Sequence, residues 1–350
     1  MDPIISILIV THNQKLLLER CLDSVLKQVI HVPYEIIVSD DGLDDGTEEF
    51  VKSLGVSDRV LKNKNLIRLS WVRCNSEDCS PVTTSHRIGW NKLTAYKQAI
   101  GKYFVCIDAD DFLIGTDLYQ KELEMLEAHP ECSLVQTRTL MLDDGENLDQ
   151  VRACFPFSEK LRNGVVYSLE DVLRYGLRGQ YQSNMFRRRP QDDMEQVFGL
   201  GRGFDDINIT YYHLQYGPEV FLDMTGYVWV QYPKSDSHSL NIDEQIIVYG
   251  LIPLNLAMRF EKSKYVFLGL GVRKLRGAIR SASRSPDLNE NRRLAWSTSE
   301  AFIYRFYSER THGISSWSRY WFIWLLLLMM RRLRLNSKFW LDLLYRLMVK

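Results

Sequence analysis

The first 140 residues alternate between short apolar runs and segments in which apolar residues recur every three or four positions. The apolar runs are rich in β-branched and aromatic residues, which favour strands, and lie at 4–10, 34–39, 67–72, 103–107 and 133–140. The segments between them have the spacing of amphipathic helices, at about 15–28, 47–54, 86–100 and 117–128. Strands that alternate with helices build a mostly parallel sheet with helices on both faces, so this alternation predicts a Rossmann-like α/β domain.

Acidic loops directly follow two of the predicted strands. The strand at 34–39 ends in Asp40-Asp41-Gly42, and the strand at 103–107 runs into Asp108-Ala109-Asp110-Asp111. In open α/β sheets, ligands bind at the carboxyl ends of the strands. We therefore expect the two loops to lie on the functional edge of the sheet.

The second loop has the chemistry of a metal site. Three carboxylates within four residues repel one another unless a positive charge lies among them, and carboxylate oxygens suit Mn²⁺ or Mg²⁺. The alternative is a run of acids that is favoured by the dipole of the helix predicted from Asp117. The first loop has its own alternative, a glycine-containing turn with solvated aspartates.

A third acidic pair, Asp205 and Asp206, precedes a segment with helical character. Acids at a helix start are stabilised by its dipole, whereas the functional interpretation is a general base that deprotonates an acceptor hydroxyl. No GxxxxGK[ST] phosphate loop is present anywhere in the chain.

Charge separates the two ends of the chain. The 350 residues carry 44 Lys and Arg and 44 Asp and Glu, but residues 259–350 hold 19 of the bases and 6 of the acids. Within this basic, mostly helical region, the apolar run at 320–330 is too short for the roughly 20 residues of a transmembrane helix. We expect a segment near 320–350 to lie on an anionic membrane surface; the alternative is a core helix with a solvated basic face. No aromatic and basic platform accompanies the charge, which disfavours a nucleic-acid partner.

Taken together, these residues resemble the family 2 glycosyltransferases, inverting enzymes with the GT-A fold. The resemblance lies in five segments in the family's order: 5–13, 36–47, 99–111, 203–210 and 232–239. It implies nucleotide-sugar binding, with a UDP-sugar as the expected donor, by Val10, Thr11, Asn13, Asp40, Asp41, Asp108 and Ala109. It implies Mn²⁺ or Mg²⁺ binding by Asp110. It also implies that Asp206 is the catalytic base, with Asp205 where the family usually has Glu, which leaves open which of the two acts.

The chain departs from the family pattern in two places. His12 stands where an aromatic residue is common, and the usual Arg-Asn-x-Gly pattern before the second acidic loop is missing. Arg87 or Lys92 could pair with a diphosphate there. Because most lysines and arginines lie on the surface, we interpret both as solvated helix residues.

The sequence thus predicts a GT-A catalytic domain at 1–240 and a basic, mostly helical region at 241–350. The expected function is metal-dependent, inverting sugar transfer to a saccharide, plausibly lipid-linked, in surface polysaccharide assembly. No signal peptide is evident, the six cysteines lack metal-ligand spacing, and we expect a cytoplasmic protein that is peripheral on the membrane.

Three alternatives remain. A catalytically degenerate relative that acts as a membrane scaffold does not explain why the acids are retained. A nucleotidyltransferase would carry a glycine-rich basic loop where Thr11-His12-Asn13-Gln14 stands. A lipid-binding protein would explain the basic region but not the three acidic clusters.

Overall fold

The computed structural model describes most of the first 232 residues and a few positions beyond them. The described residues are 2–42, 44–75, 84–144, 147–155, 160–175, 177, 179–190, 206–232, 256, 260–263, 266–267 and 270. The chain divides into two compact units, Met1–His238 and Ser239–Lys350. The segment near 320–350 lies outside the described residues. Within those that are described, no helix combines the length and apolar character needed to cross a membrane.

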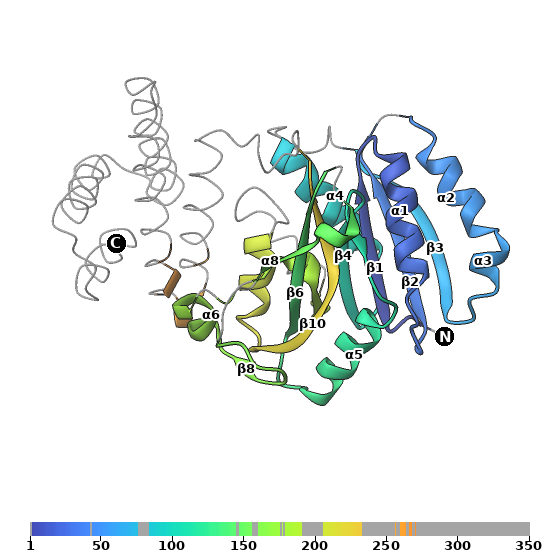
Figure 1. Cartoon of the computed structure of the whole chain (residues 1–350). Helices are drawn as coiled ribbons and strands as arrows, with labels where there is room; N and C mark the ends of the chain where they lie inside the picture. Colours follow the sequence, from blue (N-terminus) through green and yellow to red (C-terminus); the bar gives the residue numbers. More distant parts are fainter. Residues whose placement is uncertain are drawn as a thin grey trace, which may run out of the picture. The chain divides into compact units, whose positions relative to one another are not determined.

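One half of the sheet in the first unit is parallel. Its strands are β1 (Ile5–Thr11), β2 (Tyr34–Asp40), β3 (Leu66–Arg73) and β4 (Tyr103–Asp108), in the spatial order β3-β2-β1-β4. The chain runs from β1 outward to β3 and then returns to β4 on the other side of β1 (Figure 1). In the register, Val10 lies opposite Ser39 on one side and Asp108 on the other, so the carboxyl ends of β1, β2 and β4 lie level.

The other half of the sheet is mixed. Strand β9 (Asn184–Arg187) runs antiparallel between β4 and β6 (Leu134–Asp143), and β10 (Glu219–Gln231) runs parallel to β6. Three short antiparallel strands complete it: β5 (Phe112–Leu113), β7 (Arg152–Phe155) and β8 (Val166–Tyr167). The predicted α/β fold is confirmed, and these antiparallel strands modify its mostly parallel sheet.

Helices cover both faces of the parallel half, and all residues of β1 and β2 are therefore buried. Ile5, Ile7 and Ile9 pack in one hydrophobic cluster with residues of α1 (Lys15–Leu26). Alternate residues of a strand point to opposite faces, and α4 (Thr84–Gln98) packs against β1 and β2. The remaining described helices are α2 (Thr47–Gly55), α3 (Asp58–Leu61), α5 (Leu118–Ala128), α6 (Leu169–Tyr175), α8 (Asp206–His213) and the 3₁₀ turns η2 (Leu148–Gln150), η3 (Tyr181–Ser183) and η5 (Glu261–Ser263).

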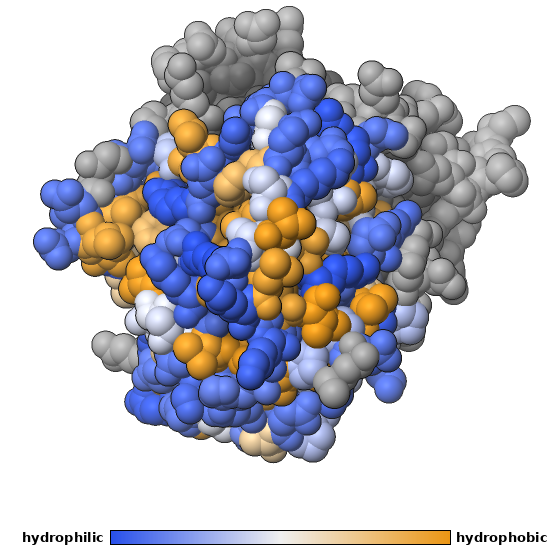
Figure 2. Space-filling view, turned by 90° about the vertical axis from the view of Figure 1, so that its right-hand side faces the viewer, coloured by the Kyte–Doolittle hydropathy of each residue, from blue (hydrophilic) through white to orange (hydrophobic). Residues whose placement is uncertain are grey.

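Strand β3 forms one edge of the sheet, on the side of the domain that also carries α2 and α3. Figure 2 shows that hydrophobic and hydrophilic groups are interspersed on this side. The exposed apolar residues there include Val56, Leu61 and Ile67. Two cations, Arg68 and Arg73, lie along β3 itself, and charges on an edge strand oppose pairing with another chain.

Candidate active site

The reversal of strand order between β1 and β4 creates the position at which open α/β sheets bind ligands. Strand β1 is followed on one side by β2 and β3, whereas β4 lies on its other side. Because ligands of open α/β sheets bind at the carboxyl ends of strands where the order reverses, we take this edge between β1 and β4 as the candidate binding crevice. The two acidic loops predicted from the sequence both start at this edge, because Asp40 ends β2 and Asp108 ends β4.

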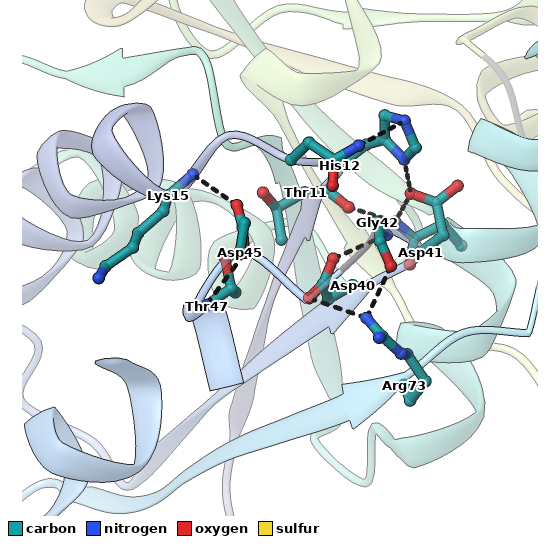
Figure 3. A network of polar contacts seen from close by, with 11 residues as sticks. Thr11, His12, Lys15, Asp40, Asp41, Gly42, Asp45, Thr47 and Arg73 are labelled. Atoms are coloured by element: carbon teal, nitrogen blue, oxygen red, sulfur yellow. Dashed lines mark hydrogen bonds and ion pairs between the residues drawn. The ribbon is translucent and has the colours of Figure 1, made fainter. Parts of the chain in front are cut away.

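Asp40 stabilises the loop that follows β2 (Figure 3). Its Oδ1 accepts a hydrogen bond from the Gly42 amide at 2.9 Å, and its Oδ2 lies 3.4 Å from Nη1 of Arg73, which also donates to the Gly42 carbonyl at 2.8 Å. The carboxyl group is buried, and this burial raises its pKa even though the amide and Arg73 act in the opposite direction. Asp40, Gly42 and Arg73 are thus joined by three contacts that shape the loop.

Gly42 allows the loop that follows β2 to approach the loop that follows β1 closely. A Cβ at this position would lie 2.6 Å from the backbone nitrogen of Asn13 and 2.7 Å from its Oδ1, shorter than any real contact. Asn13 itself has a φ of 53°, in the left-handed region that asparagine tolerates better than most residues. The sequence predicted a nucleotide-sugar role for Asn13, and the structure places it directly beside the Asp40-Asp41-Gly42 loop.

Asp41 is held by side chains from two other elements. Its Oδ1 lies 3.1 Å from Nδ1 of His12 and 3.3 Å from Nδ2 of Asn91. Asn91, on α4, is buried and also donates to the Thr11 carbonyl at 3.0 Å. His12, which departs from the family pattern, is therefore a polar partner of Asp41. Sequence reasoning missed Asn91, because nothing in its surroundings on α4 indicates a contact with β1 and β2.

Asp108 forms an ion pair with a lysine that the sequence analysis had assigned to the surface. Nζ of Lys92 lies 3.1 Å from Oδ1 of Asp108, and the Lys92 side chain is only 5% exposed. Gln182 of η3 donates to Oδ2 of Asp108 at 2.9 Å. The interpretation of Lys92 as a solvated helix residue was wrong, because α4 places it beneath the end of β4. The side chain of Arg87 lies outside the described residues.

The carboxylate of Asp110 is mostly buried, and few nearby groups offset its negative charge. Burial and then repulsion from Asp108 raise its pKa to about 6. Arg20 on α1 donates to the Asp110 backbone carbonyl at 2.6 Å and to the Tyr232 hydroxyl at 3.1 Å. Within the described part of the chain, no side chain donates a hydrogen bond to the Asp110 carboxylate.

Asp111 is the structural acid of this loop. It is buried, accepts a hydrogen bond from the Tyr227 hydroxyl, and accepts one from the Val230 amide at 2.9 Å. Burial, followed by repulsion from Asp110 and Asp108, raises its pKa well above the usual range. Asp111 thereby anchors the loop to β10.

The donor chemistry of this loop fits a divalent metal. A carboxylate whose pKa is raised by burial and by a neighbouring carboxylate gains stability when a cation comes close. Asp110 offers hard oxygen ligands of the kind that Mn²⁺ and Mg²⁺ prefer. Asp108 is less suited to this role, because Lys92 and Gln182 already contact its oxygens.

Three of the other predicted site residues lie at the ends of β1 and β4, and the remaining two lie at or just before α8 in the sequence. Val10 and Thr11 end β1, and the Ala109 amide donates to the Val10 carbonyl at 2.9 Å, so all three lie at the crevice. Asp206 is the first residue of α8, but its side chain lies outside the described residues. Asp205 lies outside them entirely.

Comparison with solved structures agrees with this fold. The structure of residues 1–349 of TarS from S. aureus in complex with UDP-GlcNAc is 17% identical in sequence and has a TM-score of 0.61. The match covers 87% of this chain and 81% of that one. The same TarS fragment in complex with UDP is 16% identical, with a TM-score of 0.57 and coverage of 87% and 80%. At these identities the likeness establishes the fold, which is that of the GT-A enzymes.

The amino-terminal part of the sequence matches a family model. Residues 6–73 match the model of the family described as Glycosyl transferase family 2. Those residues contain β1, β2, β3 and the Asp40-Asp41-Gly42 loop. This match and the fold together support a glycosyltransferase similar to family 2, which is the family that the motifs resemble.

Proposed function

We propose that the chain transfers a sugar from a UDP-sugar donor to a hydroxyl of a saccharide acceptor, with inversion at the anomeric carbon. The observation that carries this proposal is that Asp40 ends β2 and Asp108 ends β4 at the same carboxyl edge of the sheet, with Asp41 and Asp110 in the loops that follow. The TarS structures with UDP-GlcNAc and UDP support the choice of nucleotide.

The chain's own residues divide the work of binding. His12 and Asn91 orient the Asp41 carboxylate, which would accept a hydrogen bond from the nucleobase. Asp108, fixed by Lys92, would face the ribose or the diphosphate. The rest of the nucleotide-sugar site would come from the end of β1 and the loops beside it, with Val10, Thr11, Asn13, Asp40 and Ala109.

The chemical step needs a base and a means of stabilising the leaving group. We assign Asp206, with Asp205 beside it in sequence, as the base that accepts the acceptor's hydroxyl proton while the oxygen displaces the diphosphate in one step. Asp110 would hold Mn²⁺ or Mg²⁺, which when bound offsets the negative charge that develops on the leaving diphosphate. A single displacement inverts the anomeric carbon without a covalent sugar–enzyme intermediate.

The acceptor proposal rests on the basic carboxyl-terminal region. Residues 259–350 hold 19 Lys and Arg against 6 Asp and Glu, together with the apolar run at 320–330. This combination suits an anionic membrane surface. We propose a lipid-linked saccharide acceptor at the cytoplasmic face of a membrane, in the assembly of a surface polysaccharide.

Calorimetric titration with UDP, with and without Mn²⁺, tests the donor site. We expect metal-dependent binding that is lost in Asp110→Asn and retained in Asp58→Asn, a control in which the changed aspartate pairs with Lys62 on the exposed helix α3. Absence of binding to UDP, GDP, CDP and dTDP under both conditions would contradict the proposal. UDP release from a panel of UDP-sugars then identifies the donor.

Vesicle flotation tests the membrane proposal on the full chain. We expect binding to phosphatidylglycerol vesicles but not to phosphatidylcholine vesicles. Replacing Arg331, Arg332 and Arg334 by Glu should abolish it, because anionic lipid attracts basic residues. Equal binding of the variant and the original chain would contradict the proposal.

A further inference from the structure

Lys92 occupies an unusual place for a lysine. It lies on α4, yet its ammonium is within 3.1 Å of Oδ1 and 3.4 Å of Oδ2 of Asp108, and its side chain is 5% exposed. Asp108, in contrast, is 25% exposed. A buried ammonium is costly unless an acid compensates it. The pair therefore joins a buried cation to a carboxylate that still reaches the crevice.

A single 3₁₀ turn holds both members of this pair. The Lys92 ammonium lies 4.5 Å from the centre of the Tyr181 ring, and Gln182 donates to Oδ2 of Asp108 at 2.9 Å. Tyr181 and Gln182 are neighbours in η3. Three segments far apart in the sequence thus fix the position of the Asp108 carboxylate: α4, the end of β4 and η3.

Asp110 differs from Asp108 although only one residue separates them. Arg20 contacts its backbone carbonyl, at 2.6 Å, and among the described residues no side chain donates to its carboxylate. The carboxylate of Asp108 is therefore in direct contact with a cation and an amide donor, whereas Lys92 and Arg20 act on the Asp110 carboxylate only from a greater distance. Two acids so different in their partners are suited to different tasks.

We propose that Lys92 is a positioning residue of the active site. As the counter-ion of Asp108, it fixes that carboxylate for contact with the donor and leaves Asp110 as the carboxylate that carries the divalent cation. This division of labour rests on the proposed function, because it concerns the same nucleotide and metal site.

Mn²⁺ binding to the full chain, measured by electron paramagnetic resonance of the free ion, tests the proposal without recourse to activity. In Asp108→Asn the Lys92 charge is no longer offset by Asp108 near the metal, so we expect the Kd for Mn²⁺ to rise about 10-fold. Removing both charges, in Lys92→Met with Asp108→Asn, should return the Kd to within about 3-fold of its original value. Lys92→Met alone frees a carboxylate and should tighten Mn²⁺ binding, whereas Asp110→Asn should abolish it.

Two outcomes would overturn the proposal. If the double variant lost Mn²⁺ as completely as Asp110→Asn, Asp108 would itself be a ligand of the metal. If Lys92→Met lowered the melting temperature but left Mn²⁺ and UDP affinity unchanged, Lys92 would have only a structural role. Lys92→Arg, which keeps the charge, should have a UDP affinity within about 3-fold of that of the original chain. Lys97→Met is the matched control, because Lys97 lies on the same helix with its ammonium over the Trp90 ring.

A thermal unfolding cycle on the ligand-free protein separates this proposal from the proposed function. If Lys92 and Asp108 are partners, the double variant should lose less melting temperature than the two single variants together. A chain that shows this coupling but binds neither UDP nor Mn²⁺ contradicts the proposed function and the metal role of Asp110, while the pairing stands. A chain that binds both ligands but shows no coupling, in unfolding or in Mn²⁺ affinity, contradicts the inference alone.

Discussion

Glu35 and Asp110 are buried acids at opposite ends of the parallel strands, and their surroundings differ. At the amino ends, Glu35 is fully buried and has a donor for each oxygen: the Ser6 hydroxyl at 2.5 Å and the Ile100 amide at 2.9 Å to Oε1, and the Arg68 Nε at 2.8 Å to Oε2. At the carboxyl ends, Asp110 lies beside Asp108 with its pKa raised to about 6. The compensated acid joins strands to the helix end, whereas the uncompensated acid keeps a charge available for a ligand.

This contrast teaches how one sheet serves both stability and binding. Arg68 of β3 connects Glu35 of β2 to the Gln98 carbonyl at the end of α4. Such a network stabilises the fold because every partner is satisfied. At the other edge, burial and repulsion from Asp108 disfavour the charged form of Asp110, and a cationic ligand would relieve this unfavourable interaction.

The largest expected effect separates activity from stability. Asp110→Asn should lower turnover by about 10²–10⁴-fold, because the variant loses the ligand for a metal that stabilises the leaving group by several kcal/mol. The same change removes a poorly compensated charge and should not lower the melting temperature. Turnover by UDP release and unfolding by circular dichroism measure the two effects. A variant that loses both together would place Asp110 with Glu35 as a structural acid.

The next effect concerns the amino-terminal edge. Glu35→Ala leaves Arg68, Ser6 and the Ile100 amide without their partner and should destabilise the fold by about 3 kcal/mol, since Arg68 keeps partial access to water. For a domain of this size that corresponds to a fall of about 6–12 °C in melting temperature. Turnover of the folded fraction should stay unchanged. The control is Lys62→Met, which removes an exposed ion pair worth under about 1 kcal/mol.

The third effect is a pH dependence that the two edges should not share. The pKa of Asp110 is raised in the folded state from 3.8 to about 6, so the folded chain binds more protons than the unfolded chain between these values. Stability from this residue is therefore present below about pH 4 and lost as the pH rises through about 6, at most about 1–3 kcal/mol. Melting temperatures in EDTA should show this slope, and Asp110→Asn or saturating Mn²⁺ should reduce it. An unchanged slope in the variant would assign the effect to other acids.

The smallest expected effect concerns Asp41, the proposed partner of the nucleobase. His12→Ala removes one of the donors to Oδ1 of Asp41 and should weaken UDP binding by about 3–10-fold, the value of one hydrogen bond. Calorimetry measures it, with His129→Ala as a control that removes a similar histidine–glutamate contact. Unchanged affinity would mean that His12 is not needed to orient Asp41.

Local sequence was sufficient for the parallel half of the fold. The run at 67–72 predicted β3, which spans Leu66–Arg73, and the helix predicted at 117–128 is α5, Leu118–Ala128. Period and side-chain shape determine such elements locally, and the level carboxyl ends of parallel strands then bring Asp40 and Asp108 to one edge. The antiparallel insertion of β9 between β4 and β6 left no periodic signal, because its pairings join residues far apart in the chain.

By itself, then, the sequence determined which acids follow which strands, and so the class of enzyme. Only the tertiary structure decided how those acids are charged and held. Lys92 and Gln182 reach Asp108 from α4 and η3, and Asn91 reaches Asp41 from the face opposite α1. The physical reason is that burial and the distance between charges set the electrostatics of a site, and both arise from packing between elements that the spacing of residues along one element does not encode.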